Sequence, residues 1–271
     1  MIAHMLTQLA LWVLAAGAGA GPLERGEALL EKGDLSGART AFSEAQRAAP
    51  KDARPYYYLG VIAEKQGDPR AASTHYEKAV ALDPKLAEAW TNLSALDLAA
   101  GRPDDALKAA LRATAARPDS FEAWFNLGLV HDALKRHAEA IRAYSSALKQ
   151  KPNDLDTLVN LGAAERRAGS LDGAIGHFQQ AVRLAPKDAQ AHYNLGACLS
   201  DAGKLDDAAR EFRTAVTIDA KYALAWCRLA SVELKRGRCE GARAAFAEFF
   251  KLAPKSPRGE ADDALKACKP R

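Results

Sequence analysis

A proline recurs through this chain at a fixed interval of 34 residues, and this periodicity constrains the fold more than any other feature. The series comprises Pro50, Pro84, Pro118, Pro152, Pro186 and Pro254. Its one empty point is Ala220, where the flanking residues still align with those around Pro84. A fixed period of this length is typical of repeat proteins, in which each repeat is one supersecondary unit. Each unit buries its apolar surface only against its neighbours.

Large, small and apolar residues fall in the same columns of every repeat. If Ala53 is taken as position 1, position 7 is always Leu and position 20 is always Ala, while position 8 is small and position 24 is aromatic apart from Ala110. Position 4 is occupied by Tyr56, Trp90, Trp124, Leu158, His192 and Trp226. Positions 4, 7, 8 and 11 recur at helical spacing, and so do positions 20, 24 and 27. The sequence therefore predicts an all-α chain with two antiparallel helices per repeat, joined at turns such as Gly67-Asp68-Pro69.

This column pattern resembles the tetratricopeptide repeat over residues 19–256. The resemblance implies a right-handed α-solenoid of antiparallel helix pairs, whose first helices line a concave groove. The expected units lie near residues 19–52, 53–86, 87–120, 121–154, 155–188, 189–222 and 223–256, and residues 257–271 are expected to form a capping helix. Two places depart from the family pattern. The unit 87–120 carries Ser94, Asp97 and Ala110, and the last unit has Phe249 where Ala is usual.

The first twenty residues form a separate segment that contains no Asp, Glu, Lys or Arg. The apolar run from residue 5 to residue 16 is too short to span a membrane comfortably, and small residues that suit a cleavage site follow it. We therefore expect residues 1–20 to be a signal peptide, the protein to be periplasmic or secreted, and no integral membrane span to remain after cleavage. The alternative is an uncleaved N-terminal anchor.

Position 6 of the repeat is the most informative column for function. In the resembled family the first helix lines the groove, so position 6 is expected to face a ligand. This column reads Tyr58, Asn92, Asn126, Asn160, Asn194 and Arg228. A carboxamide offers an acceptor oxygen and two N–H donors, which match the C=O and N–H groups of an extended peptide. The four Asn residues therefore predict an asparagine ladder that grips peptide backbone, although Asn is also common at this position in the family for other reasons.

Aromatic and basic residues beside this column are further candidates for the groove. Tyr57, Phe125 and Tyr193 at position 5 are expected anchors for a bound peptide, and Arg166 places positive charge in the middle of the groove. Two other interpretations remain open at this point. The rings equally suit packing between neighbouring helices, and the charges equally suit a solvated surface.

Several function classes find no support in the sequence. The net charge is only +4, and position 2 carries Glu88, Glu122 and Asp156, which argues against nucleic acid as a partner. No nucleotide-binding glycine motif is present, and the histidines share no spacing suited to a metal. The chaperone-docking carboxylate clamp of the family is also absent, because no repeat has Lys at position 5. We expect no enzyme activity, no cofactor and no metal.

The four cysteines are Cys198, Cys227, Cys239 and Cys268, and four cysteines allow three pairings. Cys239 lies at the turn inside the last repeat, and Cys268 lies near the end of the expected capping helix. If the protein is exported, we expect a Cys239–Cys268 disulfide that pins the cap. Reduced, buried thiols are the alternative.

The sequence as a whole favours a non-enzymatic module that binds a partner protein, or an extended peptide segment of one, in its groove. Such a module would act as an adaptor, an assembly factor or a chaperone. The alternative is a structural scaffold that oligomerises or docks onto a larger complex while its groove stays empty.

Overall fold

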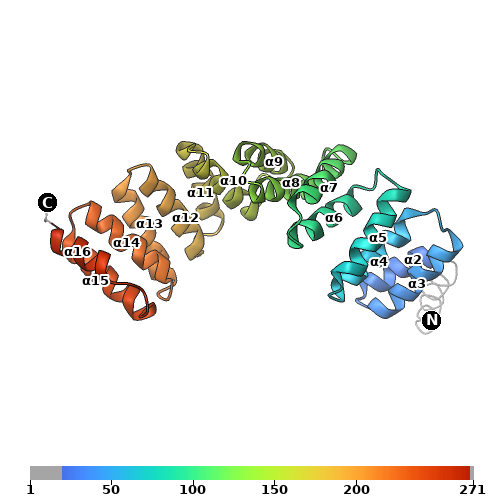
Figure 1. The fold of residues 1–271 in the computed structure, drawn as a ribbon, viewed down its shortest axis with the longest axis horizontal. Coiled ribbons are helices and arrows are strands. Elements are labelled where there is room, and N and C mark those ends of the chain that lie inside the picture. Colours follow the sequence, from blue (N-terminus) through green and yellow to red (C-terminus); the bar gives the residue numbers. More distant parts are fainter. Residues whose placement is uncertain (1–19, 269–271) are drawn as a thin grey trace, which may run out of the picture. The chain divides into compact units, whose positions relative to one another are not determined.

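The computed structural model describes residues 20–268, and within this range the chain forms helices and no strands (Figure 1). The first helices of the repeats are α2 (Pro22–Glu31), α4 (Ala53–Lys65), α6 (Ala87–Ala99), α8 (Phe121–Ala133), α10 (Leu155–Arg167), α12 (Ala189–Asp201) and α14 (Ala223–Lys235). The second helices are α3 (Leu35–Ala48), α5 (Pro69–Leu82), α7 (Pro103–Ala116), α9 (His137–Gln150), α11 (Leu171–Leu184), α13 (Leu205–Ile218) and α15 (Cys239–Leu252). The short helix α16 (Gly259–Ala267) follows them. The predicted all-α solenoid of helix pairs is confirmed.

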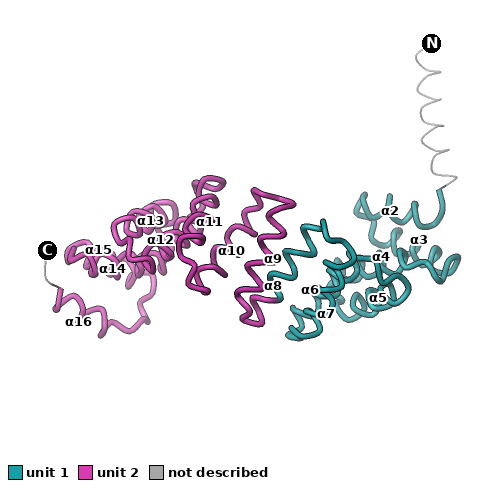
Figure 2. The backbone as a smooth tube through the Cα atoms, turned by 90° about the horizontal axis from the view of Figure 1, so that it is seen from above, with its two compact units in different colours: residues 1–130 teal, residues 131–271 magenta. Residues whose placement is uncertain are grey.

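The chain divides into two compact units, residues 1–130 and 131–271 (Figure 2). The boundary falls inside α8, so this helix contributes to both units. Within unit 1, each of the helices α2 to α7 contacts the next one along the chain. Within unit 2, the same holds from α9 to α16, and the first helices α10, α12 and α14 also contact one another in order.

The predicted signal peptide falls almost entirely on residues outside the described range, which begins at residue 20. Among the helices that the structure does describe, none combines the length and the apolar character needed to cross a membrane.

Four of the helix pairs close over a contact between a large aromatic ring and a glycine. The ring at position 24 lies against the glycine at position 8 in the pairs Phe42 with Gly26, Tyr76 with Gly60, Phe178 with Gly162 and Phe212 with Gly196. A Cβ atom added to Gly60 would lie only 2.5 Å from Cε1 of Tyr76, and the Tyr76 side chain is fully buried. The small residue at position 8 therefore sets how closely the two helices of a repeat approach.

The repeat at residues 87–120 replaces this contact with hydrogen bonds. Position 24 is Ala110 there, so position 8 can carry Ser94 in place of glycine. The Ser94 hydroxyl is buried and donates to the carbonyl oxygen of Ala106 at 2.8 Å, which ties α6 to α7. At the end of α6, the buried Asp97 carboxylate pairs with Arg102 at 2.5 Å. In this repeat, Ser94 and Ala110 together replace the contact between glycine and ring, and the unusual Asp97 is paired with Arg102.

In the repeats that carry Trp at position 4, this residue ties the first helix to the loop before it. The indole nitrogens of Trp90, Trp124 and Trp226 donate to the carbonyl oxygens of residues 84, 118 and 220, at 2.8–3.0 Å. Leu158 cannot make this bond. In its repeat, Nε2 of Gln180 donates instead to the carbonyl oxygen of Pro152, at 3.1 Å. The loop carbonyl thus keeps a partner even where the column loses its polar side chain.

Substitution of Gly60 tests whether the contact between position 8 and position 24 limits the packing. Gly60→Leu would force a side chain into the space of the buried Tyr76 ring, and we expect it to lower the free energy of unfolding by about 1–3 kcal/mol. Gly176→Leu is the matched control, because a Cβ at Gly176 meets no atom within 4 Å. This control should raise stability by roughly 0.5–1 kcal/mol through helix propensity. Urea unfolding followed by circular dichroism measures both, and equal effects at the two sites would contradict the packing account.

Candidate binding face

The predicted asparagine ladder occupies different surroundings in different repeats. In unit 1, Nδ2 of Asn92 donates to the hydroxyl oxygen of Tyr76 at 3.0 Å. Nδ2 of Asn126 donates to the Ser94 hydroxyl at 2.8 Å, and the Asn126 residue is only 6% exposed. Asn126 is therefore wedged between α6 and α8, contrary to the expectation from sequence, and we leave it out of the binding face. Its amide provides a hydrogen-bond donor to the buried Ser94 hydroxyl and so links neighbouring repeats.

In unit 2 the same column remains more accessible. Asn160 on α10 and Asn194 on α12 are half-buried, and Arg228 on α14 is exposed. Asn160 makes no side-chain hydrogen bond to any residue in the range 20–268. The Asn194 side chain accepts a bond from Nε2 of Gln190 at 3.0 Å, and within the described chain its own amide nitrogen donates to no acceptor. We call the surface of α10, α12 and α14 that carries these three residues the first-helix face of unit 2.

The aromatic residues predicted as anchors pack largely against other rings. Tyr58 stacks on Phe42 of the preceding repeat with ring centroids 4.6 Å apart, and Tyr57 lies against both Tyr58 and Tyr76. Phe125 stacks on Phe121 at 5.8 Å. All of the predicted anchors are half-buried, so each presents part of its ring to solvent while the rest packs between helices. The expected packing between helices is thus observed, and the role of these rings as peptide anchors stays a prediction.

Tyr193 links the first-helix face to the start of α14. Its ring lies 5.1 Å from that of Tyr222 and 5.7 Å from that of Phe212. The Tyr222 hydroxyl donates to Oε1 of Gln190 at 2.7 Å, and burial raises the pKa of Tyr222 to about 12. Gln190 and Tyr222 were not predicted as site residues, although their positions beside Asn194 and Tyr193 could have suggested them.

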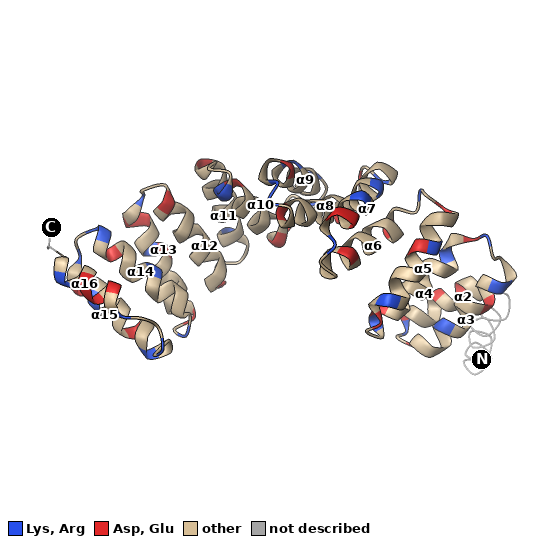
Figure 3. Cartoon of the chain, in the orientation of Figure 1, with Lys and Arg blue, Asp and Glu red and all other residues tan. Residues whose placement is uncertain are grey.

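The charges on the first-helix face are partly committed to ion pairs between neighbouring helices. Nε of Arg166 on α10 lies 2.5 Å from Oδ2 of Asp201 on α12, and Arg167 pairs with Asp132 at 2.9 Å. Arg228 and Lys235 on α14 form no ion pair with any residue of the range 20–268. Charges of both signs alternate over the helices of both units (Figure 3). Net positive charge on this face is thus concentrated at α14.

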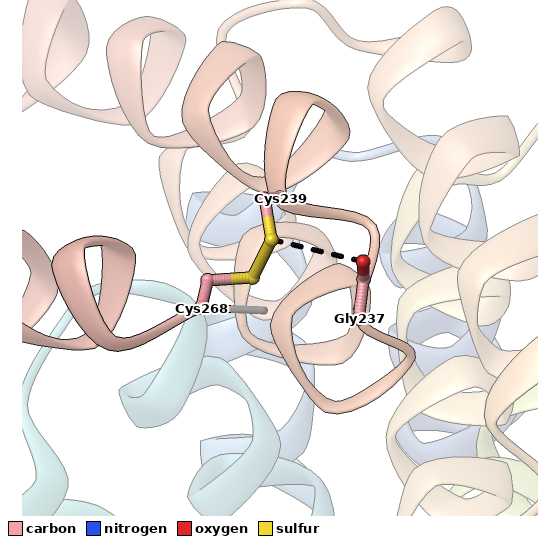
Figure 4. Close-up of a disulfide and its surroundings, with 3 residues drawn as sticks. All are labelled: Gly237, Cys239 and Cys268. Atoms are coloured by element: carbon pink, nitrogen blue, oxygen red, sulfur yellow. Dashed lines mark hydrogen bonds between the residues drawn. A yellow bond between two sulfur atoms is a disulfide. The ribbon is translucent and has the colours of Figure 1, made fainter. Parts of the chain in front are cut away.

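A disulfide bond joins the segment after the last helix, α16, to the final repeat. The sulfur atoms of Cys239, at the start of α15, and Cys268, just after α16, are 2.14 Å apart, and the Cα atoms are 5.8 Å apart (Figure 4). This Cα distance lies within the range of native disulfides. Cys198 and Cys227 are unpaired, and burial raises the pKa of both thiols.

The described residues present no constellation suited to metal binding, since no group of three or more His, Cys, Asp or Glu side chains gathers in residues 20–268. His177 and His192 each contact a glutamate, Glu165 at 2.8 Å and Glu211 at 2.7 Å. The hydrogen bond that Nδ1 of His177 donates to the Glu165 carboxylate raises the pKa of His177. These pairs join helices within a repeat, so their geometry accounts for them as packing contacts.

Comparison with known protein families identifies one family that matches this chain. The tetratricopeptide repeat profile matches residues 23–87, 92–154 and 159–223. No curated protein matches the sequence. Three of the similar solved structures are YrrB, PilF of Pseudomonas aeruginosa and MamA. YrrB, described as a TPR protein with an unusual peptide-binding site, is 23% identical with a TM-score of 0.64, over 68% of this chain and 95% of YrrB.

The other two structures match to a similar extent. PilF is 18% identical with a TM-score of 0.63, and the match covers 78% of this chain and 96% of PilF. MamA is 29% identical with a TM-score of 0.54, over 62% of this chain and 92% of MamA. At these identities, YrrB and PilF establish the fold alone.

Alanine substitution distinguishes the buried carboxamide from an accessible one. Asn126→Ala leaves the buried Ser94 hydroxyl without its donor, so we expect it to lower the free energy of unfolding by about 1–3 kcal/mol. Asn160→Ala removes an amide that has no partner in residues 20–268, so stability should change by less than about 0.5 kcal/mol. Chemical denaturation of the two variants measures this difference. If Asn126→Ala were as stable as the parent chain, the structural role of Asn126 would be wrong.

Proposed function

Because the chain belongs to the tetratricopeptide repeat family, whose repeats act in protein–protein interaction, we propose that it binds an extended segment of a partner protein along the first-helix face of unit 2. The observation that supports this most strongly is the placement of Asn160 and Asn194 at the same position of the neighbouring helices α10 and α12. Asn160 is not engaged within residues 20–268, and the Asn194 amide nitrogen donates to nothing there. Both groups can therefore hydrogen-bond to peptide backbone.

The magnitudes require further contacts beyond these two amides. Two amides contribute about 1–3 kcal/mol if each net hydrogen bond is worth roughly 0.5–1.5 kcal/mol. Association and ordering cost about 4–15 kcal/mol, so apolar and ionic contacts must supply the rest. The half-buried ring of Tyr193 and the exposed guanidinium of Arg228 lie on the same face and suit those roles. We propose no catalytic role, and the chain would act as an adaptor, an assembly factor or a chaperone.

A scaffold that docks through the second helices is the alternative function, and one observation favours it. Three exposed aliphatic residues occupy the same repeat position at the ends of α11, α13 and α15. They are Leu184, Ile218 and Leu252, which are 44%, 38% and 39% exposed. A row of this kind could contact a second chain without any peptide on the first-helix face.

Substitution of the two accessible amides tests the peptide-binding function. Peptides selected from a random twelve-residue phage library on the purified chain provide the probes, and fluorescence anisotropy gives their Kd. We expect the double variant Asn160→Ala/Asn194→Ala to weaken binding roughly 5- to 150-fold, since it removes about 1–3 kcal/mol of hydrogen bonding. Helicity should not change.

The matched control is Gln150→Ala/Gln179→Ala, which removes two exposed amides from the second helices α9 and α11 of the same unit. This control should leave the Kd unchanged. Unaltered affinity in the Asn160/Asn194 variant, or failure to select any peptide, would favour the scaffold alternative.

We also propose that the protein is exported. The Cys239–Cys268 disulfide supports this, because such bonds persist in oxidising compartments and are rare in the cytosol. Peptide mapping without reductant, on protein isolated from its native cells after thiol blocking, should recover Cys239 and Cys268 in one linked species. Recovery of both as blocked free thiols would contradict the proposal, and the mature N-terminus in the same digest reports whether residues 1–20 were removed.

A further inference from the structure

A cavity of about 420 Å³ lies between α14, α15 and α16, at the C-terminal end of unit 2. Phe246, Phe249 and Phe250 of α15 line it, together with Leu234 of α14. Ala261 and Ala264 face it from α16. A volume of this size falls within the range of ligand-binding pockets, and three aromatic rings give it an apolar wall.

The cavity lies where α16 follows the final repeat in place of a further first helix. At position 27 the earlier repeats carry a small residue that lets the next first helix approach closely. These residues are Ala45, Ala79, Ala113, Ala147, Ala181 and Ala215, all buried. The last repeat has Phe249 at that position, and the α16 residues that line the gap are Glu260, Ala261 and Ala264. The gap that a large residue on α16 would fill therefore remains open.

Two attachments hold α16 across this gap. At its N-terminal end, the Arg258 guanidinium lies 4.5 Å from the centroid of the Phe250 ring. At its C-terminal end, Cys268 is bonded to Cys239 of α15. No residue of α16 is buried. The helix is thus attached at both ends, and between them Ala261 and Leu265 pack, only partly buried, against the core of unit 2.

The rim of the cavity carries one lysine and one glutamate, and on the α14 side, where the lysine lies, it continues the first-helix face. Lys235 lines the cavity and has no acidic partner within residues 20–268, and Glu260 is the one acidic residue in the lining. Arg228, two turns earlier on α14, occupies the same column as Asn160 and Asn194. A peptide that follows this column from α10 to α14 therefore reaches the cavity at its end.

We propose that this cavity is an anchor pocket for the bound peptide, and that it takes a bulky apolar side chain whose neighbouring residue is acidic. The inference rests on the proposed function, since it assumes that an extended peptide lies on the first-helix face. The apolar side chain fills the space among Phe246, Phe249 and Phe250, and the acidic neighbour pairs with Lys235 at the rim. The Cys239–Cys268 bond keeps the pocket formed by holding α16 in place.

Cavity filling from α16 is the direct test. Ala264→Phe places a ring in the pocket, and Ala267→Phe places the same ring on an exposed residue of the same helix that does not line it. Peptides selected from the random twelve-residue phage library should be enriched in Leu, Phe or Trp beside Asp or Glu. We expect their affinity to fall at least tenfold for Ala264→Phe and to stay unchanged for Ala267→Phe.

Two further variants test the charge and the cap. Lys235→Gln should weaken the selected peptides several-fold, and it should not affect versions in which the acidic residue is replaced by Gln or Asn. Cys268→Ser should weaken binding as α16 is released. If Ala264→Phe lowers the melting temperature, Ala261→Leu provides a smaller filling at the same wall.

The outcomes separate this inference from the proposed function. If the peptides bind Ala264→Phe and Ala261→Leu as well as the parent chain but lose affinity for Asn160→Ala/Asn194→Ala, the anchor pocket is wrong and groove binding stands. If filling abolishes binding and the Asn variant does not, the pocket stands and the ladder fails. If filling converts a dimer to a monomer in sedimentation without changing peptide affinity, the occupant is a second copy of this chain, and the peptide pocket is overturned. If no peptide is selected, both proposals fail.

Discussion

A ring at position 24 lies on a small residue at position 8 in most repeats of this protein, and the rest of the fold depends on that contact. The pairs formed by Tyr76 with Gly60 and Phe212 with Gly196 are so close that a Cβ on the glycine meets the ring at 2.5 and 3.0 Å. The contact fixes the distance between the two helices of a repeat. The residue at position 6 of the next first helix lies beside the preceding repeat. The residues at positions 8 and 24 of that repeat therefore determine which polar groups are offered to it.

The preceding repeat offers a different group to Asn92, Asn126 and Asn194, whereas Asn160 follows Tyr144 and makes no side-chain hydrogen bond within residues 20–268. Where the ring is Tyr76, its hydroxyl accepts a hydrogen bond from Asn92. Where Ala110 replaces the ring, Ser94 takes the place of glycine, and the Asn126 amide donates a hydrogen bond to the Ser94 hydroxyl. Phe178 precedes Asn194 and offers no hydrogen-bonding atom, so the Asn194 amide keeps a free donor within residues 20–268. A bond to the preceding repeat and a bond to a peptide compete for the same carboxamide.

The helix pairs could be predicted from the sequence because their signals are local and repeated. The spacing of Leu, Ala and aromatic residues, and the turns at glycine, sufficed to place both helices of every repeat. The ladder could not be predicted in full, because the column shows which residue stands at position 6 but not which polar atom the previous repeat presents. The expected contact of Cys239 with Cys268 followed from the regular stack, and the structure contains that bond. Phe249 was visible as a departure, yet its consequence, an open cavity under α16, depends on small side chains from a helix outside the repeat.

The account as a whole rests on the claim that the accessible first-helix residues of unit 2 hold a partner's backbone. A crystal structure of the chain with a selected peptide tests that claim most directly, because it gives the distances from the carboxamides of Asn160 and Asn194 to the peptide. The account predicts both carboxamides within about 3.2 Å of peptide N–H or C=O groups. A peptide bound across α11 and α13, with both carboxamides still exposed to water, would contradict it.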